Sequence, residues 1–315
     1  MTSTVDYACD SKPWTAPVQR TAILRVALAG CGAVGSALLR ELEIQREALS
    51  ERHGMTIELV RVLVRDLERE RNAPFDAEVL TNDIAEFLET PADVVVEAIG
   101  GLDPARHIAV TVLGRSQRLV TANKELLAAH GSELSALAQQ RGTTLRYDAA
   151  VGGGVPILRV LNESLGAGGA TRVRGILNGT SNFVLTRLEQ GASLDAALDD
   201  ARRCGFAEAD VSRDLDGRDA ADKLALIAWT AFGIAPESLV VRRTTLLPDP
   251  RRYVDLAARF GARVRQVAEC ELIDGSVVAF VEPVLVAADS ALGRTHDEGN
   301  LAEVFTGWRA PLCAS

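Results

Sequence analysis

The stretch Ile23-Leu-Arg-Val-Ala-Leu-Ala-Gly-Cys-Gly-Ala-Val-Gly35 decides the fold of the first half of the chain. Its apolar start predicts a buried strand, and its glycines then follow at the spacing G-x-G-x-x-G. Residues 36–44 continue with apolar side chains at helical spacing. A strand, a glycine turn and a helix in this order are typical of a unit that binds a dinucleotide, with the pyrophosphate at the helix N-terminus. The predicted cofactor-binding residues of the turn are Gly30, Gly32, Ala33, Val34 and Gly35.

A second apolar strand, residues 57–64, ends in Arg65 and Asp66. In dinucleotide-binding folds the adenosine ribose is recognised at this place: an acidic residue favours NAD, whereas an arginine pairs with the 2′-phosphate of NADP. Because Arg65 comes first, the pattern favours NADP over NAD. The alternative is an exposed arginine that only ends a strand.

Two further segments end at the same expected edge of a parallel sheet. Residues 92–99 predict a buried strand that opens onto Gly100 and Gly101, so Gly100 is a further candidate for cofactor binding. Residues 118–122 predict a short strand, after which Asn123 is a credible N-cap for a helix that begins at Lys124. Lys124 is therefore expected at the mouth of the ligand crevice, unless it is an ordinary surface lysine.

The pattern changes after three consecutive glycines at 152–154, a loop that can clasp a ligand or a cation, or act as a hinge between domains. The second half mixes predicted helices, such as residues 193–203, with predicted strands at 172–177, 263–272 and 277–288.

The most acidic stretch, residues 204–223, runs directly into the apolar segment 224–229. If this region is helical, Asp219 and Lys223 lie one turn apart on the same face. An exposed ion pair would explain that spacing. A site that needs both a carboxylate and a lysine would explain it equally.

Length and composition narrow the class of protein. A chain of 315 residues with 47% hydrophobic and 24% charged residues predicts a globular protein of two domains. The net charge of −9 argues against nucleic acid or an anionic membrane as the main partner. The five cysteines and four histidines are scattered, which argues against structural zinc and fits a reducing cytoplasm. Residues 1–20 are polar and lack the apolar core of a signal peptide.

Taken together, the motifs resemble homoserine dehydrogenase. They lie at residues 30–35, 94–101, 120–124, 151–156, 175–183, 205–210 and 214–223. The resemblance covers roughly residues 21 to 308. It implies a homodimeric enzyme of threonine and methionine biosynthesis that interconverts L-aspartate-4-semialdehyde and L-homoserine with NAD(P), and it does not extend to the C-terminal regulatory domain of many relatives.

The resemblance also implies roles for individual residues. Lys223 would exchange a proton with the substrate oxygen, Lys124 would act beside it and contact the cofactor, and Asp219 would position the lysines. The residues implied to bind substrate are Glu208, Asp214, Gly179 and Thr180. The residues implied to hold a monovalent cation, the first three through backbone carbonyls, are Val151, Gly153, Val155 and Asp148.

The predicted fold class is α/β, with a Rossmann-type dinucleotide-binding domain and a second α+β domain for substrate binding and dimerisation. The predicted division is a polar tail at 1–20, the dinucleotide-binding domain at 21–150, the second domain at 151–288, and a shortened segment at 289–315 that returns towards the nucleotide domain. Two other functions remain open: a dehydrogenase for a different amino-aldehyde or hydroxy-amino acid, and a catalytically silent NADP-binding regulator.

Overall fold

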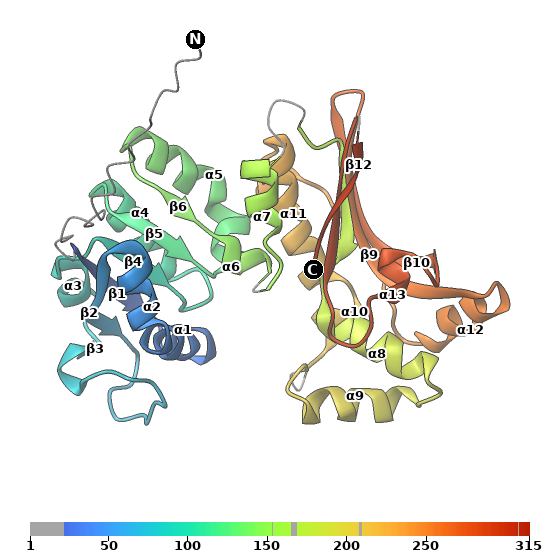
Figure 1. Cartoon of the computed structure of the whole chain (residues 1–315), viewed down its shortest axis with the longest axis horizontal. Helices are drawn as coiled ribbons and strands as arrows, with labels where there is room; N and C mark the ends of the chain where they lie inside the picture. The colour runs from blue at the N-terminus through green and yellow to red at the C-terminus, as the bar shows by residue number, and fades with distance from the viewer. Residues whose placement is uncertain (1–21, 153, 165–168, 208–209, 308) are drawn as a thin grey trace, which may run out of the picture.

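The computed structural model describes residues 22–152, 154–164, 169–207, 210–307 and 309–315. Figure 1 shows two bodies side by side: the blue and green first half of the chain, and a second body built around the long orange and red strands. Helix α11 (Arg218–Phe232) lies between the green helices of the first body and the strands of the second.

The first body is built on a sheet whose strands, as far as the structure describes them, run in the order β3-β2-β1-β4-β5-β6. All neighbouring pairs are parallel. The strands are β1 (Ala22–Ala29), β2 (Met55–Leu63), β3 (Leu80–Thr81), β4 (Val94–Glu97), β5 (Arg118–Thr121) and β6 (Leu145–Arg146). This is the strand order of dinucleotide-binding domains, so the predicted Rossmann-type α/β fold is confirmed.

Helices cover both faces of this sheet, which is why its strands are apolar on both sides. Leu28 of β1 packs with Leu39 of α1 on one face, whereas Ala27 and Ala29 belong to the cluster that contains Ile108 of α4 on the other. The helices of this body are α1 (Ala33–Ile44), α2 (Arg46–His53), the short η1 (Ala77–Val79), α3 (Ile84–Glu89), α4 (Ala105–Gly114) and α5 (Lys124–Gln140).

The second sheet has the order β12-β11-β7-β9-β10-β8 in the described residues. Its pairs are antiparallel except β10 with β8. The strands are β7 (Arg172–Ile176), β8 (Arg242–Arg243), β9 (Ala262–Ile273), β10 (Ser276–Ala287), β11 (Leu301–Thr306) and β12 (Arg309–Ala314). A tight turn joins β9 to β10, with positive φ at both Asp274 (48°) and Gly275 (78°), as a two-residue hairpin of type I′ requires.

The described helices of the second half of the chain are α6 (Asp148–Val151), α7 (Ile157–Arg159), η2 (Val160–Ser164), α8 (Gly179–Glu189), α9 (Leu194–Arg203), α10 (Ser212–Leu215), α11, η4 (Pro236–Ser238), α12 (Arg251–Arg259) and α13 (Ala291–Arg294). From Leu224 onward helix α11 is apolar on nearly all sides, because one face contacts the sheet and another contacts α5 and α6. It starts after Gly217 (φ 80°) and ends at Gly233 (φ 73°), whose N–H donates to Trp229 O.

Strand β6 ends at Arg146 and α6 begins at Asp148, so the last strand of the first sheet is short. The end of the chain differs from the sequence expectation. Within the segment expected to return to the nucleotide domain, β11 pairs with β7 and β12 pairs with β11, so this part extends the second sheet. The domain boundaries stay a prediction, and the polar tail at 1–20 lies outside the described residues.

Candidate functional site

The glycine turn after β1 has the geometry that its sequence predicts. Gly30 has φ 97°, and a Cβ added to Gly35 would come within 2.1 Å of Gly30 O, so only glycine lets α1 lie this close to the strand. At Gly32, by contrast, an added Cβ meets nothing within 4 Å. Gly32 is the N-cap of α1 and provides no side-chain cap, which leaves N–H groups of the first helical turn available to an anion.

A cavity of about 800 Å³ opens in front of this turn. Its lining includes Gly30, Gly32, Arg65 and Gly100, which are four of the residues predicted to bind the cofactor, together with Asp66. Ala33, Val34 and Gly35 form the adjoining first turn of α1. The space and the open helix N-terminus fit a dinucleotide, with the pyrophosphate beside Gly32.

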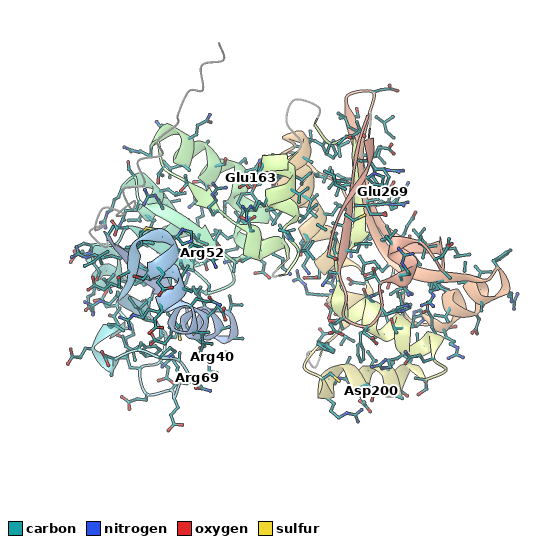
Figure 2. The ribbon with its side chains drawn as sticks, in the orientation of Figure 1. Arg40, Arg52, Arg69, Glu163, Asp200 and Glu269 are labelled. Carbon is teal, nitrogen blue, oxygen red and sulfur yellow. The ribbon has the colours of Figure 1, made fainter. Side chains whose placement is uncertain are left out.

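Two further arginines line the same cavity, Arg69 and Arg71. The side chain of Arg71 donates to the backbone oxygen of Asp66 and, at 2.6 Å, to that of Arg69, which folds the loop after Arg65 back on itself. Figure 2 shows Arg69 at the outer end of the first body. These two residues were not among the predicted cofactor-binding residues, although the arginine-rich stretch 65–71 was the signal available in the sequence.

Lys124 is positioned by a buried polar network at the ends of β4 and β5. Asn123 caps α5 by accepting from Leu126 N (3.1 Å), and its amide nitrogen donates to Gly101 O (2.7 Å). Glu97, which is fully buried, accepts from Ile99 N (2.9 Å) and from the Thr121 hydroxyl (2.5 Å). These bonds fix the glycine pair relative to the start of α5, and therefore fix the backbone that carries Lys124.

The structure brings the three predicted catalytic residues together from both bodies. Asp219 accepts from Lys124 Nζ through Oδ1 and forms an ion pair with Lys223 Nζ through Oδ2 at 2.9 Å. Lys223 Nζ also donates to Leu177 O at 2.7 Å. The side chains of Lys124, Asp219 and Lys223 are 28%, 15% and 19% exposed, so the cluster is sheltered but reachable by a small ligand.

Asn178 connects this cluster to Asp214. Its side-chain oxygen caps α8 by accepting from Ser181 N (2.7 Å), and its amide nitrogen donates to Asp214 Oδ1 (2.7 Å) and Asp219 Oδ2 (2.9 Å). The N-terminus of α8, the short α10 and the first turn of α11 therefore meet at one point. Residues 178–182 are rich in short polar side chains, but Asn178 was not among the predicted site residues.

Burial and charge act in opposite directions on the two aspartates. Burial by itself would raise the pKa of Asp219, but Lys223 and Lys124 together hold it well below its usual range. Burial raises the pKa of Asp214 against the hydrogen bond from Asn178, and the neighbouring charge of Asp219 adds to the rise. Asp219 is thus a permanent anion between two lysines, whereas Asp214 favours its protonated form more than an ordinary aspartate does.

A second cavity, of about 380 Å³, adjoins Asp219. It is lined by Thr180, Gly205, Phe206, Ala207, Asp210, Arg213, Asp214 and Asp219. Gly179 lies at the start of α8, where an added Cβ would come within 2.7 Å of Glu298 O, and the Thr180 hydroxyl donates to Phe206 O (2.5 Å). Three of the predicted substrate-binding residues therefore lie at or beside this cavity.

The C-terminal half of helix α11 is held against the first body. Trp229 stacks on Tyr147 with ring centroids 5.1 Å apart, and Tyr147 Oη lies 3.0 Å from the Thr230 hydroxyl. An added Cβ at Gly131 of α5 would lie 3.2 Å from the Trp229 ring. This close contact fixes the helix that carries Lys223 relative to the helix that carries Lys124.

Some predicted site residues cannot be placed. Glu208 and Gly153 lie outside the described residues, so the proposed ammonium contact and one cation ligand have no structural description. Of the other cation candidates, Val151 ends α6, Asp148 begins it, and Val155 O accepts from Ile157 N at 2.8 Å. The cation site stays a prediction.

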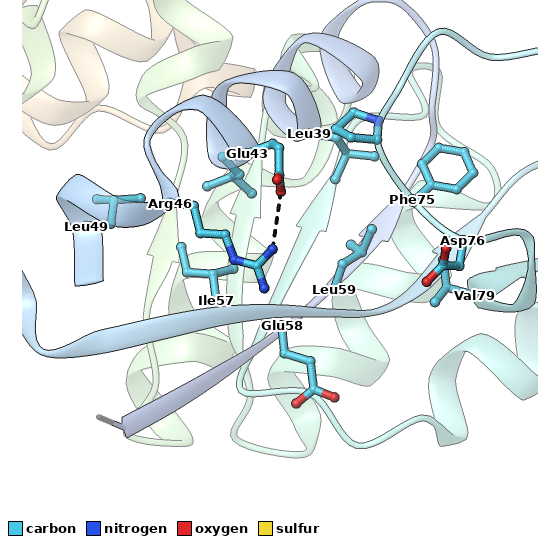
Figure 3. A pocket seen from close by; sticks show the side chains of 12 residues that line it. Leu39, Glu43, Arg46, Leu49, Ile57, Glu58, Leu59, Phe75, Asp76 and Val79 are labelled. Carbon is cyan, nitrogen blue, oxygen red and sulfur yellow. Dashed lines mark ion pairs between the residues drawn. The ribbon is translucent and has the colours of Figure 1, made fainter. Parts of the chain in front are cut away.

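Another cavity, of about 230 Å³, lies between α1, α2 and β2 (Figure 3). Leu39, Ile57 and Phe75 give it apolar walls, and an ion pair of 3.6 Å joins Glu43 to Arg46 across it. None of the predicted catalytic, substrate-binding or cofactor-binding residues lines it. It is separate from the candidate site.

Comparisons with known proteins match both bodies. The family model "Homoserine dehydrogenase" matches residues 156–314, and the model "Homoserine dehydrogenase, NAD binding domain" matches residues 30–148. The chain is 34% identical to a homoserine dehydrogenase of Bacillus subtilis over 90% of its length, and 40% identical to one of Synechocystis over 67%. The crystal structure of a homoserine dehydrogenase from Thiobacillus denitrificans superposes with a TM-score of 0.84 at 33% identity, covering 94% of this chain and 69% of that one.

The matched relatives are longer than this chain. It spans 66% of the length of the Bacillus subtilis protein and 48% of that of the Synechocystis protein. Within the described residues, no helix is both long and apolar enough to cross a membrane.

Proposed function

Because this chain belongs to the homoserine dehydrogenase family, we propose that it interconverts L-aspartate-4-semialdehyde and L-homoserine with a nicotinamide dinucleotide. The observation that carries this proposal is the cluster in which Asp219 engages both Lys124 and Lys223, beside the cavity that contains Asp214 and Thr180. The glycine turn and the 800 Å³ cavity in front of it supply the place for the cofactor.

The bound nicotinamide would supply or accept the hydride. The chain itself has to hold the dinucleotide and move a proton. The first turn of α1 would bind the pyrophosphate through its free N–H groups. The loop that begins at Arg65 would surround the adenosine end, and Gly100 would lie along the cofactor where β4 ends.

Lys223 is the proposed proton donor in reduction and the proton acceptor in oxidation. Reduction of an aldehyde places negative charge on its oxygen, and an ammonium group at that oxygen both stabilises the charge and donates the proton. Leu177 O and Asp219 orient the Lys223 ammonium, and Lys124 lies on the other oxygen of the same carboxylate. Lys124 therefore adds a second positive charge near the reacting oxygen.

The substrate would occupy the cavity beside Asp219. The carboxylates in the wall of this cavity suit the ammonium group of an amino acid. Within the described residues, the proposed substrate contacts are Asp214, Gly179 and Thr180. Glu208 is proposed to bind the same ammonium group on the basis of the sequence resemblance alone.

The test is oxidation of L-homoserine, followed by nicotinamide absorbance, with wild type and Lys223→Ala. Removal of the acid–base group should lower kcat by roughly 10²- to 10⁴-fold while the variant still binds the reduced dinucleotide. Arg218→Ala, five residues earlier on α11 with an exposed side chain, is the matched control and should keep its activity. A fully active Lys223→Ala enzyme would contradict the proposed mechanism.

The same assay separates the other candidate functions. Turnover of a different hydroxy-amino acid in place of homoserine would identify a related dehydrogenase, and dinucleotide binding without any turnover would identify a silent regulator. Arg65, Arg69 and Arg71 around the cofactor cavity support a preference for NADP, so kcat/KM should be higher with NADP than with NAD.

We also propose a homodimer in the cytoplasm, on the basis of the family resemblance and of the scattered cysteines. Those described are free, and the buried Cys270 has its thiol pKa raised to about 12 by burial. Sedimentation of the purified chain would test the dimer.

A monovalent cation at Val151 and Val155 is proposed on the basis of the same family resemblance. Potassium dependence of the activity would test it.

A further inference from the structure

The charged side chains in the wall of the cavity beside Asp219 are all acidic except one. Asp210, Asp214 and Asp219 all contribute to its wall. Among the described residues that line it, Arg213 is the one cationic side chain. A wall of this kind suits an ammonium group but repels a carboxylate, so any ligand that carries both groups needs a cation within the cavity.

Arg213 is held in place from both bodies of the molecule. It lies on α10, and its Nη2 donates to Asp222 Oδ2 of α11 at 2.9 Å. Its Nη1 lies 3.7 Å from Glu125 Oε1 at the start of α5, one residue after Lys124. Its Nε forms no hydrogen bond with any residue that the structure describes. The guanidinium group is therefore oriented by two carboxylates and still has donors available, on a side chain that is 50% exposed.

The two lysines of the cluster are less available for this role. Both contact Asp219, and Lys223 also donates to Leu177 O. In the proposed reaction they act at the substrate oxygen, which gains a proton when the aldehyde is reduced and loses it when the alcohol is oxidised. The carboxylate of homoserine lies at the other end of that small molecule, so it requires a different partner.

We propose that Arg213 binds the α-carboxylate of the amino-acid substrate and thereby restricts the enzyme to substrates that carry one. A planar guanidinium group can pair with a carboxylate through two parallel hydrogen bonds, which fixes both the position and the orientation of the ligand. The inference rests on the proposed function, because it assigns a binding residue for that reaction at that site.

The test compares L-homoserine with 3-aminopropan-1-ol, the same amino alcohol without its carboxylate. Arg213→Ala should raise KM for homoserine by roughly 10- to 100-fold, the loss expected for a hydrogen-bonded charge pair, with kcat changed by less than about threefold. The same variant should leave kcat/KM for 3-aminopropan-1-ol unchanged. Arg213→Lys should recover part of the homoserine affinity, because it restores the charge without the planar fork.

The result that would overturn the inference is an Arg213→Ala enzyme that keeps the wild-type KM for homoserine. An equal loss on both substrates would also overturn it, since that outcome assigns Arg213 to the contact between α5 and α11 alone. Arg218→Ala removes a neighbouring exposed arginine and should change neither constant.

Calorimetric binding of homoserine, with the reduced dinucleotide present so that no oxidation occurs, separates this inference from the proposed function. Wild type that binds homoserine in this experiment but does not oxidise it in the absorbance assay with the oxidised dinucleotide refutes the proposed function, and weaker binding by Arg213→Ala then still supports the inference. Wild type that binds no homoserine refutes the inference directly.

Discussion

The glycine turn at Gly30–Gly35 is shaped by the absence of side chains, whereas the cluster around Asp219 is shaped by charged side chains that come from both bodies. In the turn, a single added methyl group at Gly35 would lie 2.1 Å from Gly30 O. In the cluster, Lys124 and Lys223 are 99 positions apart in the chain and share one carboxylate. The first half of the site depends on backbone shape, and the second on charge balance.

This difference means that the two halves should fail in different ways. A substitution in the turn should act through sterics, on folding or on the approach of the cofactor. A substitution in the cluster that keeps the size of the side chain should cause no steric clash, but it should leave a charged group without its partner in a sheltered place.

The largest effect on stability is expected from Asp219→Asn. The substitution keeps the shape of the side chain but leaves two ammonium groups facing each other without their shared anion. Loss of one partner from a buried ion pair costs about 3–5 kcal/mol, and the partial exposure of this cluster places the expected loss of unfolding free energy near the lower limit, at about 3 kcal/mol. Homoserine oxidation should fall at least about tenfold because both lysines lose their orientation. Chemical denaturation and the absorbance assay would measure the two effects.

The matched control is Asp255→Asn on α12. Asp255 is paired with Arg251 one turn away at 3.1 Å, and its side chain is 59% exposed. An exposed pair of this type contributes only about 0.3–0.5 kcal/mol, and it lies in no proposed site. Similar destabilisation by the two substitutions would show that the cluster has no special charge balance.

The next largest effect is expected from Gly35→Ala in the turn. The added methyl group overlaps Gly30 O, so β1 and α1 must separate, at a cost of roughly 1–3 kcal/mol in unfolding free energy. Gly32→Ala should behave differently because its methyl group meets no atom of the chain within 4 Å. It should leave stability unchanged and weaken dinucleotide binding, since the backbone at this glycine is expected to approach the pyrophosphate.

Gly114→Ala is the control for these two variants. Gly114 ends α4, an added Cβ there has open space, and glycine-to-alanine changes in helices commonly raise stability by about 0.5–1 kcal/mol. Thermal unfolding and titration with the reduced dinucleotide would separate the effects. Loss of stability in Gly32→Ala, or normal stability in Gly35→Ala, would contradict the steric account of the turn.

The same contrast explains what could be predicted from the sequence. The turn and its flanking elements are contiguous, so the strand–glycine–helix order at residues 23–44 was sufficient to predict the parallel sheet and the dinucleotide-binding fold. The N-cap Asn123 was also predicted correctly, because capping depends on neighbouring residues. The family assignment from the combined motifs is confirmed as well.

Features that depend on distant contacts were predicted less completely. The pairing of Lys124 with Asp219 and the hub formed by Asn178 depend on how α5, α8 and α11 meet, which no local pattern encodes. The place of β11 and β12 in the second sheet was missed for the same reason, since strand pairing over more than a hundred residues leaves no local signal. The roles of the individual site residues stay predictions until the variants are measured.

The smallest predicted effect concerns pH, and it separates two aspartates within the cluster. Because burial raises the pKa of Asp214, the folded state binds its proton up to a higher pH than the unfolded state does, so this group lowers stability as pH rises from the ordinary value of about 3.9 through the raised folded value. For Asp219 the folded pKa is depressed, so its contribution is fully present above about pH 4 and is lost only as pH falls towards the folded value. Asp214→Asn can still accept the hydrogen bond from Asn178, and it should therefore gain stability relative to wild type as pH rises above about 4, by less than about 1 kcal/mol because the site is partly solvated. The deficit of Asp219→Asn should stay constant above about pH 4 and shrink below it. Denaturation curves at a series of pH values would measure both, and a pH-independent difference between Asp214→Asn and wild type would show that burial does not perturb Asp214.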